Sequence, residues 1–425
     1  MRWKRYPAYK DSGVEWLSEV LEHWDEYSLH WCVEEINTDV RTDSMIYIGL
    51  EHIDSWTGKV RFVDQVSEGI SGKHFLPGDV LFGKLRPYLA KGFVADKYGV
   101  CSGELLVLRP HGMNRFYLHY LLLSPGFVGC VDSSTYGAKM PRASWEFIRK
   151  IVIPVPSLGE QECIASFIDA QTRGIDTLIS KKQRQLELLE EKRITLITHA
   201  VTKGLDPDVK MKDSGVEWLG EVPEHWKVVS LKRMARISYG LGQPPRELED
   251  GIPLIRATDV SRGTIDLSNC LRVDPTDVPA GRDAFLEPGD IIVVRSGAYT
   301  GDSAVVPREL AGAVAGYDMI VRCSDCLAEF MAYVLLSDSM AQQINMVSSR
   351  AAQAHLNAEQ LGDCIGAFPP FEEQRSIARY LDRETTRMNV IRDKIQHSIE
   401  LLQEYRSALI SAAVTGQIDV REEVI

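Results

Sequence analysis

One long stretch of this sequence occurs twice, and the duplication restricts the possible folds more than any other feature. Matching residues lie 213 positions apart without a gap, as in Glu160-Gln161 and Glu373-Gln374. The second copy carries apolar residues three and four positions apart at Ile377, Leu381, Met388, Ile391, Ile395, Leu402, Tyr405 and Leu409, and the first copy at Ile164, Ile168, Ile175, Leu178, Leu189 and Leu196. This narrow apolar stripe is typical of a coiled coil.

Each copy is predicted to form one long helix, at residues 157–204 and 369–417. Ser157 and Glu160 form a capping box, and Gly204 and Gly416 follow the last apolar residues. About forty residues at 1.5 Å each give a rod of roughly 60 Å. We expect the two rods to pair as an intramolecular antiparallel coiled coil. The alternative is a pair of ordinary core helices in a globular fold.

Two further repeats extend the duplication along the chain. The first is the motif Lys-Asp-Ser-Gly-Val-Glu-Trp-Leu, which occurs at 10–17 and again at 212–219. The second is Pro-Gly-Asp, which precedes an apolar run at both of its positions, 77–79 and 288–290. One unit has therefore been copied whole. The predicted plan is a first globular domain with its repeat motif at 1–156, a helix at 157–204, a linker and second globular domain at 205–368, a second helix at 369–417 and a tail at 418–425.

Both globular domains are predicted to be mixed α/β. Apolar runs indicate strands at 45–50, 80–82, 93–95 and 105–108 in the first domain and at 254–255, 291–294, 304–306 and 319–321 in the second. Helices are expected at 116–123 and 330–336. The fold class is thus a tandem, pseudo-two-fold α/β protein with two globular domains joined by two long helices.

Composition limits the possible functions. With 44% apolar and 25% charged residues, the 425-residue chain has the make-up of a globular protein. It contains no run of eighteen apolar residues and no apolar signal segment at its start, so a cytoplasmic location is expected. Eight scattered cysteines suit reduced thiols. The net charge of -12 predicts weak DNA binding by the chain alone, through local basic loops.

The three repeated motifs together resemble the specificity (S) subunits of type I restriction-modification enzymes, the HsdS family. The resemblance covers nearly the whole chain. It implies two target-recognition domains, each reading half of a bipartite double-stranded DNA site, and two antiparallel helices that set the spacing. It also implies docking of two modification (methyltransferase) subunits and of restriction (motor-nuclease) subunits, which would carry S-adenosylmethionine, ATP and Mg. No cofactor is expected in this chain.

Catalytic signatures are absent from the sequence itself. Residues 69–74, Gly-Ile-Ser-Gly-Lys-His, lack the spacing of a phosphate-binding loop, and no Asn-Pro-Pro-Tyr loop for a flipped base occurs. We therefore predict a non-catalytic chain. One alternative is the recognition part of a fused or split methyltransferase-nuclease with its own catalysis, and another is a scaffold that does not bind DNA.

Candidate DNA contacts lie in basic, aromatic loops that contain glycine or proline. Reading DNA requires forked donors for base edges and cationic or hydroxyl groups for phosphates. In the first domain the candidates are Lys84, Arg86, Tyr88 and Lys91, with Tyr136, Lys139 and Arg142 in a second loop. In the second domain they are Arg256, Thr258, Arg295, Ser296, Tyr299, Arg350, Gln353 and Asn357. Solvated turns are the alternative for each cluster.

The frame motifs are nearly identical in the two copies, whereas the loops differ. Gly-Lys-Leu-Arg-Pro-Tyr at 83–88 stands against Val-Arg-Ser-Gly-Ala-Tyr at 294–299. We therefore expect an asymmetric, split DNA target. Trp16 and Trp218 are expected to pin the repeated motif against the long helices, and His23 and His225 to have packing or capping roles. The lone Cys323–Cys326 pair gives no reason to expect a metal site.

Overall fold

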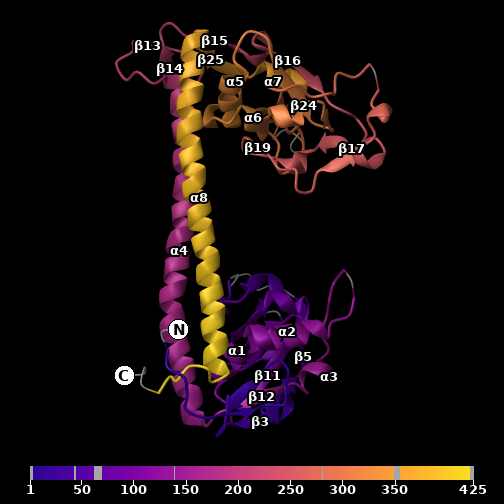
Figure 1. Ribbon diagram of the computed structural model, residues 1–425, viewed down its shortest axis with the longest axis vertical. Coiled ribbons are helices and arrows are strands. Elements are labelled where there is room, and N and C mark those ends of the chain that lie inside the picture. Colours follow the sequence, from indigo (N-terminus) through magenta and orange to yellow (C-terminus); the bar gives the residue numbers. More distant parts are fainter. Residues whose placement is uncertain are drawn as a thin grey trace. The chain divides into compact units, whose positions relative to one another are not determined.

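The structure, a computed structural model, describes residues 3–42, 45–61, 69–137, 139–279, 281–348 and 355–421. It divides into two compact units: unit 1 is Met1–Gln183 with Gln396–Ile425, and unit 2 is Arg184–Ile395. Two long helices, α4 (Leu158–Lys203) and α8 (Phe371–Val414), each begin in one unit and end in the other (Figure 1). The duplicated stretches therefore fold as helices of 46 and 44 residues.

Unit 1 is mixed α/β. Its strands are β1 (Tyr9–Asp11), β2 (Glu19–Leu21), β3 (Asp25–Ser28), β4 (Val33–Ile36), β5 (Asp39–Thr42), β6 (Ile46–Ile48), β7 (Ile70–Phe75), β8 (Val80–Gly83), β9 (Gly92–Val94), β10 (Gly99–Cys101), β11 (Leu105–Pro110) and β12 (Val152–Val155). Its shorter helices are α1 (Arg115–Leu122), α2 (Pro125–Ser133) and α3 (Trp145–Ile148). The larger sheets have the strand orders β4-β11-β8-β9 and β5-β7-β10-β6, and β3 pairs with β12.

Unit 2 repeats this plan. Its strands are β13 (Met211–Asp213), β14 (Glu221–Pro223), β15 (Lys227–Ser230), β16 (Ala235–Tyr239), β17 (Glu247–Ile255), β18 (Val260–Ser261), β19 (Thr264–Ile265), β20 (Leu271–Val273), β21 (Ile291–Val293), β22 (Ser303–Val305), β23 (Val314–Ala315), β24 (Met319–Cys323) and β25 (Ile365–Phe368). Its shorter helices are α5 (Ala328–Leu335), α6 (Asp338–Ser348) and α7 (Ala358–Asp363). The order β16-β24-β21-β22 matches β4-β11-β8-β9 of unit 1.

The central strand of each unit is buried on both faces, which explains its continuous apolar run. In unit 1, Val80 and Phe82 pack in one core with α1 and α2, whereas Leu81 packs in a second core with strands of the other sheet. In unit 2, Ile291 and Val293 likewise share a core with α5, and Ile292 faces the opposite one. Alternation along the central strand therefore places its side chains in two different cores.

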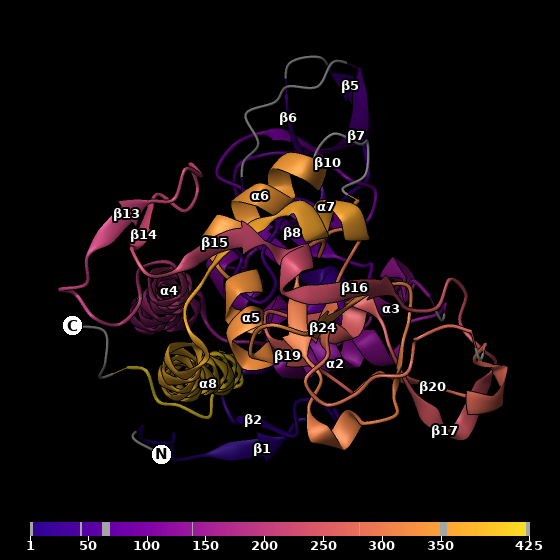
Figure 2. The same ribbon diagram turned by 90° about the horizontal axis from the view of Figure 1, so that it is seen from above.

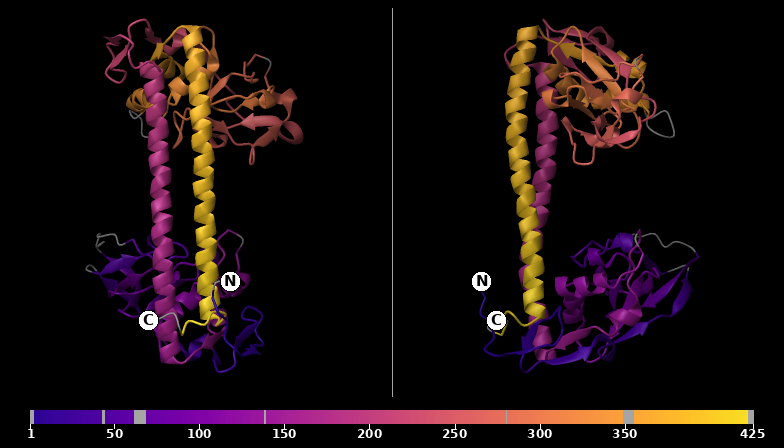
Figure 3. Two further views of the ribbon diagram at one scale, coloured as in Figure 1. Left: turned by 60° about the vertical axis from the view of Figure 1, so that its left-hand side comes forward. Right: turned by 45° about the vertical axis from the view of Figure 1, so that its right-hand side comes forward.

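The two long helices are antiparallel, as predicted. In unit 1 the beginning of α4 shares a core with the end of α8, including Ile168 and Ile410, and in unit 2 Ile197 of α4 packs in one core with Ile377 of α8. Figures 2 and 3 show the helices side by side. Within the described residues, no helix has both the length and the apolar character to cross a bilayer.

The predicted helix packing is wrong at several positions. The predicted apolar seam includes Leu178, Ile391 and Tyr405, but these side chains are 49%, 48% and 50% exposed. Ile399 and Arg406 are buried instead. The seam shifts because an α-helix has 3.6 residues per turn, so a pattern read at 3.5 drifts around the helix.

The repeated motif is anchored by a different tryptophan from the one expected. Trp16 packs edge-on against Phe127 of α2 rather than against the long helices. Trp24 is 1% exposed and donates through Nε1 to Oε1 of Glu160, near the start of α4, at 3.2 Å. His23 also contacts this carboxylate, with 2.7 Å between Nε2 and Oε1. The N-terminal motif is therefore tied to the first turn of α4.

Unit 2 contains the same anchor. Trp226 donates through Nε1 to Oε1 of Glu373 at 3.1 Å, and Nε2 of His225 lies 2.7 Å from Oε2 of the same carboxylate. The next residue of each helix has a second shared role. Gln161 accepts from the backbone N of Asn114 at 2.7 Å, and Gln374 accepts from that of Leu327 at 2.8 Å. The repeated Glu-Gln pair thus docks two elements onto each long helix.

Candidate nucleic-acid interface

The two predicted DNA-contact loops of unit 1 meet in the structure. The backbone N of Arg86 donates to the carbonyl O of Pro141 at 2.7 Å, and Leu85 forms an isolated β-bridge with Arg142. Arg142 in turn bridges to Tyr136. Residues 84–88 and 136–142 therefore form one surface, although they are fifty residues apart in the sequence.

The members of this surface differ in how freely they can reach a ligand. Arg86, Tyr88, Tyr136 and Lys139 are exposed. Arg142 donates from Nη2 to Oε1 of Glu104 at 2.5 Å, so its guanidinium is partly engaged. The candidate Lys91 lies apart, because its Nζ donates to the carbonyl O of Leu50 at 2.7 Å.

Lys84 occupies the inner edge of the surface. Its backbone N donates to the carbonyl O of Glu104 at 3.0 Å, and its carbonyl accepts from the backbone N of Ala143 at 2.9 Å. Burial lowers the pKa of the Lys84 ammonium, and the charges of Lys73 and Arg142 lower it further. The carboxylates of Glu104 and Glu35, which pair with Arg142 and Lys73, act in the opposite direction, so contact of Lys84 with phosphate stays a prediction.

Unit 2 places equivalent residues in the same register. The carbonyl O of Arg295 accepts from the backbone N of Leu356 at 2.8 Å, and Ser296 bridges to His355. These contacts correspond to Lys84 with Ala143 and Leu85 with Arg142 in unit 1. Tyr299 is 54% exposed nearby along the same loop. Arg350 and Gln353 lie outside the described residues.

Arg295 is held more tightly than a residue in a flexible tip would be. Its guanidinium carbon lies 4.1 Å from the ring centroid of Tyr317 and 4.6 Å from that of Tyr239. Its Nη2 is 3.2 Å from Nε2 of His355. Stacking between aromatic rings fixes the side chain, so Arg295 shapes the surface around it.

Three other candidates of unit 2 have internal partners. Arg256 forks onto the carboxylate of Asp259 at 3.3 Å through both Nε and Nη2, and donates from Nη2 to the carbonyl O of Asn269 at 2.9 Å. The hydroxyl of Thr258 donates to Asp259 at 3.1 Å. Asn357 caps α7 by accepting from the backbone N of Gln360 at 2.8 Å. The sequence Asn-Ala-Glu-Gln at 357–360 is the signal for this cap that our sequence analysis missed.

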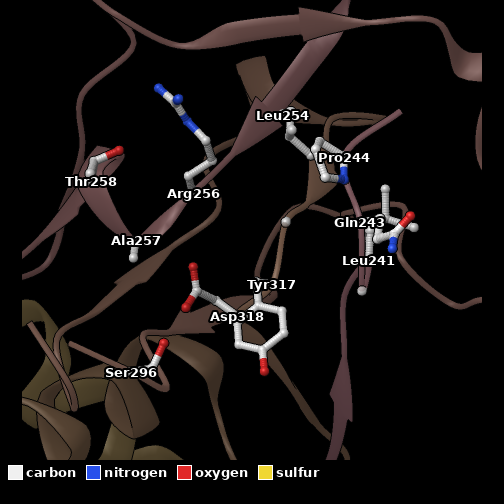
Figure 4. Close-up of a pocket in the computed structure, with 12 residues that line it drawn as sticks. Leu241, Gln243, Pro244, Leu254, Arg256, Ala257, Thr258, Ser296, Tyr317 and Asp318 are labelled. Carbon is white, nitrogen blue, oxygen red and sulfur yellow. The ribbon is translucent and has the colours of Figure 1, made fainter. Parts of the chain in front are cut away.

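A pocket of about 340 Å³ opens beside the tip of unit 2 (Figure 4). It is lined by Leu241, Gly242, Gln243, Pro244, Leu254, Arg256, Ala257, Thr258, Ser296, Gly316, Tyr317 and Asp318. It thus brings together three predicted contacts, Arg256, Thr258 and Ser296. Sequence analysis missed Asp318 and Tyr317, because nothing in the local pattern reveals that the residues before β24 border a cavity.

Comparisons with known proteins agree with this architecture. The family model of the type I restriction modification DNA specificity domain matches residues 70–188 and 223–401. The EcoBI specificity subunit of Escherichia coli is 23% identical over 316 residues, which are 72% of this chain and 65% of that protein. The match thus spans slightly less than two thirds of that relative's own length. The MjaVIII specificity subunit of Methanocaldococcus jannaschii is 24% identical over 337 residues, 76% of each chain.

A solved structure shares the fold. A chain from work on complex assembly and conformational transition of the type I R-M system aligns with a TM-score of 0.67 at 18% identity, covering 93% of this chain and 98% of that chain. The two family-model segments lie in both halves of the duplicated sequence and cover more than half of it. The chain therefore belongs to the family of type I restriction-modification DNA specificity subunits.

Proposed function

We propose that this chain is the DNA-recognition subunit of a type I restriction-modification complex, and that units 1 and 2 read different halves of a split target. The observation that carries this proposal is the contrast between two parts of each unit. The frame consists of the anchors on the long helices and the central sheet, and the tip is the loop that begins at Lys84 in unit 1 and at Arg295 in unit 2. The same helix anchors and strand register recur in both units. At the corresponding tip positions Lys84 and Arg142 are replaced by Arg295 and His355. Two copies of one frame with different tips fit an asymmetric target.

The chemistry would belong to partner subunits. Methyl transfer with S-adenosylmethionine and ATP-driven cleavage with Mg would occur on modification and restriction subunits, while this chain selects the site. Support comes from the family, whose relatives compared above are specificity subunits. A methylation assay of the purified chain tests this division, because methyl transfer without partners would favour the alternative of a chain with its own catalysis.

Exposed apolar side chains on the long helices provide a docking surface for those partners. In unit 1 they are Leu178, Leu401 and Tyr405, and in unit 2 they are Leu188, Ile194, Val390 and Ile391. Apolar residues on a charged helix surface fit the apolar face of a further amphipathic helix. Charged neighbours such as Arg184, Glu187 and Glu191 would set its orientation.

The DNA-reading role can be tested in the assembled complex. Changing Lys84 and Arg86 to alanine should lower affinity and relax sequence selection in one half-site only, which methylation sequencing detects. Changing Ser296 and Tyr299 to alanine should affect the other half. Lys150→Ala, at an exposed position away from the tip, is the control. Unchanged selection in the tip variants, or a perfectly palindromic target, would contradict the proposal.

A further inference from the structure

The pocket of unit 2 contains a buried carboxylate that the rest of the protein leaves partly unused. Asp318 is 2% exposed. Its Oδ1 accepts from the backbone N of Arg295 at 3.2 Å, whereas its Oδ2 has no hydrogen-bond partner in the described part of the chain. Figure 4 shows the carboxylate turned toward Ala257, across the pocket from Arg256 and beside Ser296. Because Asp318 lines the pocket, a donor that enters the pocket can reach this second oxygen.

Asp259, the second buried carboxylate near the pocket, is in a different state. Both of its oxygens accept hydrogen bonds, from the backbone N and guanidinium of Arg256 and from the hydroxyl of Thr258. Arg256 is therefore already neutralised and is a poor anchor for an added anion. Asp318, a carboxylate that lines the pocket, also disfavours a phosphate. The ligand should be neutral or cationic and should bring N–H donors.

The remaining walls suit a flat, weakly polar group. Leu241, Pro244, Leu254 and Ala257 supply apolar surface, and the ring of Tyr317 supplies an aromatic face. A volume of about 340 Å³ lies at the small end of the range for ligand pockets, roughly 300–1,000 Å³, which favours a single base over a dinucleotide. Adenine, cytosine and guanine each carry an exocyclic amino group, so they combine a flat ring with the required donor.

Unit 1 has no carboxylate at the position that corresponds to Asp318. In the matched strand register Leu106 pairs with Phe82 and Met319 pairs with Val293, so the position of Asp318 corresponds to Leu105, which is fully buried. The position of Tyr317 corresponds to Glu104, whose Oε1 accepts from Arg142 and whose buried Oε2 has no hydrogen-bond partner among the described residues. The pocket residues thus belong to the part of the chain in which the two copies diverge.

We propose that this pocket binds an adenine, cytosine or guanine base of the half-site read by unit 2, with Asp318 accepting a hydrogen bond from the exocyclic amino group. The inference rests on the proposed function and names a specificity-determining residue within it. The base enters unstacked from the duplex, because Asp318 is buried and does not protrude into a groove about 8.5 Å deep.

Amino-group deletion provides the test. Each adenine of the second half-site is replaced in turn by purine, each cytosine by 2-pyrimidinone and each guanine by hypoxanthine, and binding to the assembled complex is measured. At one position the loss of the amino group should weaken binding by roughly 5- to 150-fold. In Asp318→Asn the same deletion should cause no further loss. The Asn oxygen keeps the bond from Arg295 N, so the fold is retained, and the amide N–H group then faces the amino group.

Asp250→Asn, at an exposed position of the same unit, is the matched control and should keep the wild-type pattern. Selection of the first half-site reports whether each variant complex is intact. In a second measurement, 2-aminopurine placed beside the sensitive position should brighten on binding, because it loses a stacking contact when the neighbouring base leaves the stack. The pocket assignment would be overturned if the wild type tolerated every deletion, or if a deletion weakened binding equally in the wild type and in Asp318→Asn. Unchanged fluorescence would overturn it as well. A complex that selects no second half-site would instead defeat the proposed function.

Discussion

At the residue scale, the repeated Pro-Gly-Asp motif is a turn closed by a buried ion pair. Asp79 is 1% exposed, and its two oxygens accept from Nε and Nη2 of Arg109 at 2.8 and 2.9 Å. One of these oxygens also accepts from the backbone N of Leu76 at 2.8 Å. Gly78 has φ +96°, a conformation that suits glycine. The motif therefore joins strands β8 and β11 through one carboxylate.

The same pair in unit 2 offers a measurable stability difference. Asp290→Ala would leave Arg322 without its buried partner and should lower the free energy of unfolding of unit 2 by about 3 kcal/mol. Asp283 also pairs with Arg322 at 2.7 Å, but 42% of its side chain is exposed. Asp283→Ala should therefore cost less than about 1 kcal/mol. Urea denaturation followed by circular dichroism measures both, and equal losses would refute the assignment.

The anchor between the N-terminal motif and α4 should respond to acid. Burial raises the pKa of Glu160, but hydrogen bonds from His23, Ser157 and Trp24 outweigh this effect, so the pKa lies below its ordinary value of 4.5. A carboxyl whose folded-state pKa is depressed contributes stability above the unfolded-state pKa, and this contribution is lost as pH falls through the folded-state pKa.

Glu160→Gln should therefore reduce stability at neutral pH and flatten the decline of stability with falling pH below 4.5. Glu162→Gln changes an exposed carboxyl of the same helix and should leave the pH profile as in the wild type. Urea midpoints measured between about pH 3 and 6 give both profiles. If the stability of the wild type and that of Glu160→Gln fell equally with decreasing pH, Glu160 would have no such role.

At the element scale, one arginine on each long helix clamps a loop of the adjacent globular domain. Arg406 of α8 donates from Nη1 to the carbonyl O of Trp56 at 2.7 Å and from Nε to Asp176 of α4 at 2.9 Å. The matching Arg193 of α4 donates to the carbonyl O of Arg262 at 3.0 Å. Trp56 and Arg262 both have positive φ, at +64° and +44°. Each loop therefore holds a strained residue whose carbonyl meets an arginine.

Loss of this clamp should loosen the loop before it unfolds the unit. Arg406→Ala would leave Asp176 with only Lys59, 3.4 Å away, and should raise the rate of amide hydrogen exchange at residues 54–61 by at least tenfold. Arg173→Ala removes an exposed arginine of α4 and should leave the exchange of that loop unchanged. Equal exchange in the two variants would contradict the clamp.

The sequence predicted elements better than it predicted contacts between them. The long helices and the central strands follow from periodicity, which is a local property. The inward position of Ile399 and Arg406 depends on how one helix turns against another, and the burial of Asp318 depends on a loop that crosses the end of its strand. These contacts are set by tertiary packing and leave no local pattern. The loop residues Lys84, Arg86, Ser296 and Tyr299 were found from composition, and their contact with DNA stays a prediction.

At the scale of the whole molecule, the duplicated contacts all serve the frame. The Trp–Glu anchor, the docking glutamine, the Asp–Arg turn and the arginine clamp occur in both units with nearly the same distances. The residues of the tips and of the unit 2 pocket take little part in them. If the exposed tip residues Arg86, Tyr88 and Tyr299 read DNA, they could change with little loss of stability, whereas Arg142, Arg256 and Asn357 also make contacts within the fold.

The proposed spacing role of the helices can be tested by lengthening both. Insertion of one heptad into α4 near residue 187 and into α8 near residue 393 adds about 10.5 Å to each helix and keeps the apolar seam in register. If the helices set the distance between half-sites, the non-specific gap in the methylated target should grow by about three base pairs at roughly 3.4 Å each. Insertion into only one helix would give the two paired helices unequal lengths. Methylation should then be abolished, and the gap should not shift. A doubly lengthened chain that still methylates the original spacing would show that flexible segments, rather than the helices, determine the reach of the two units.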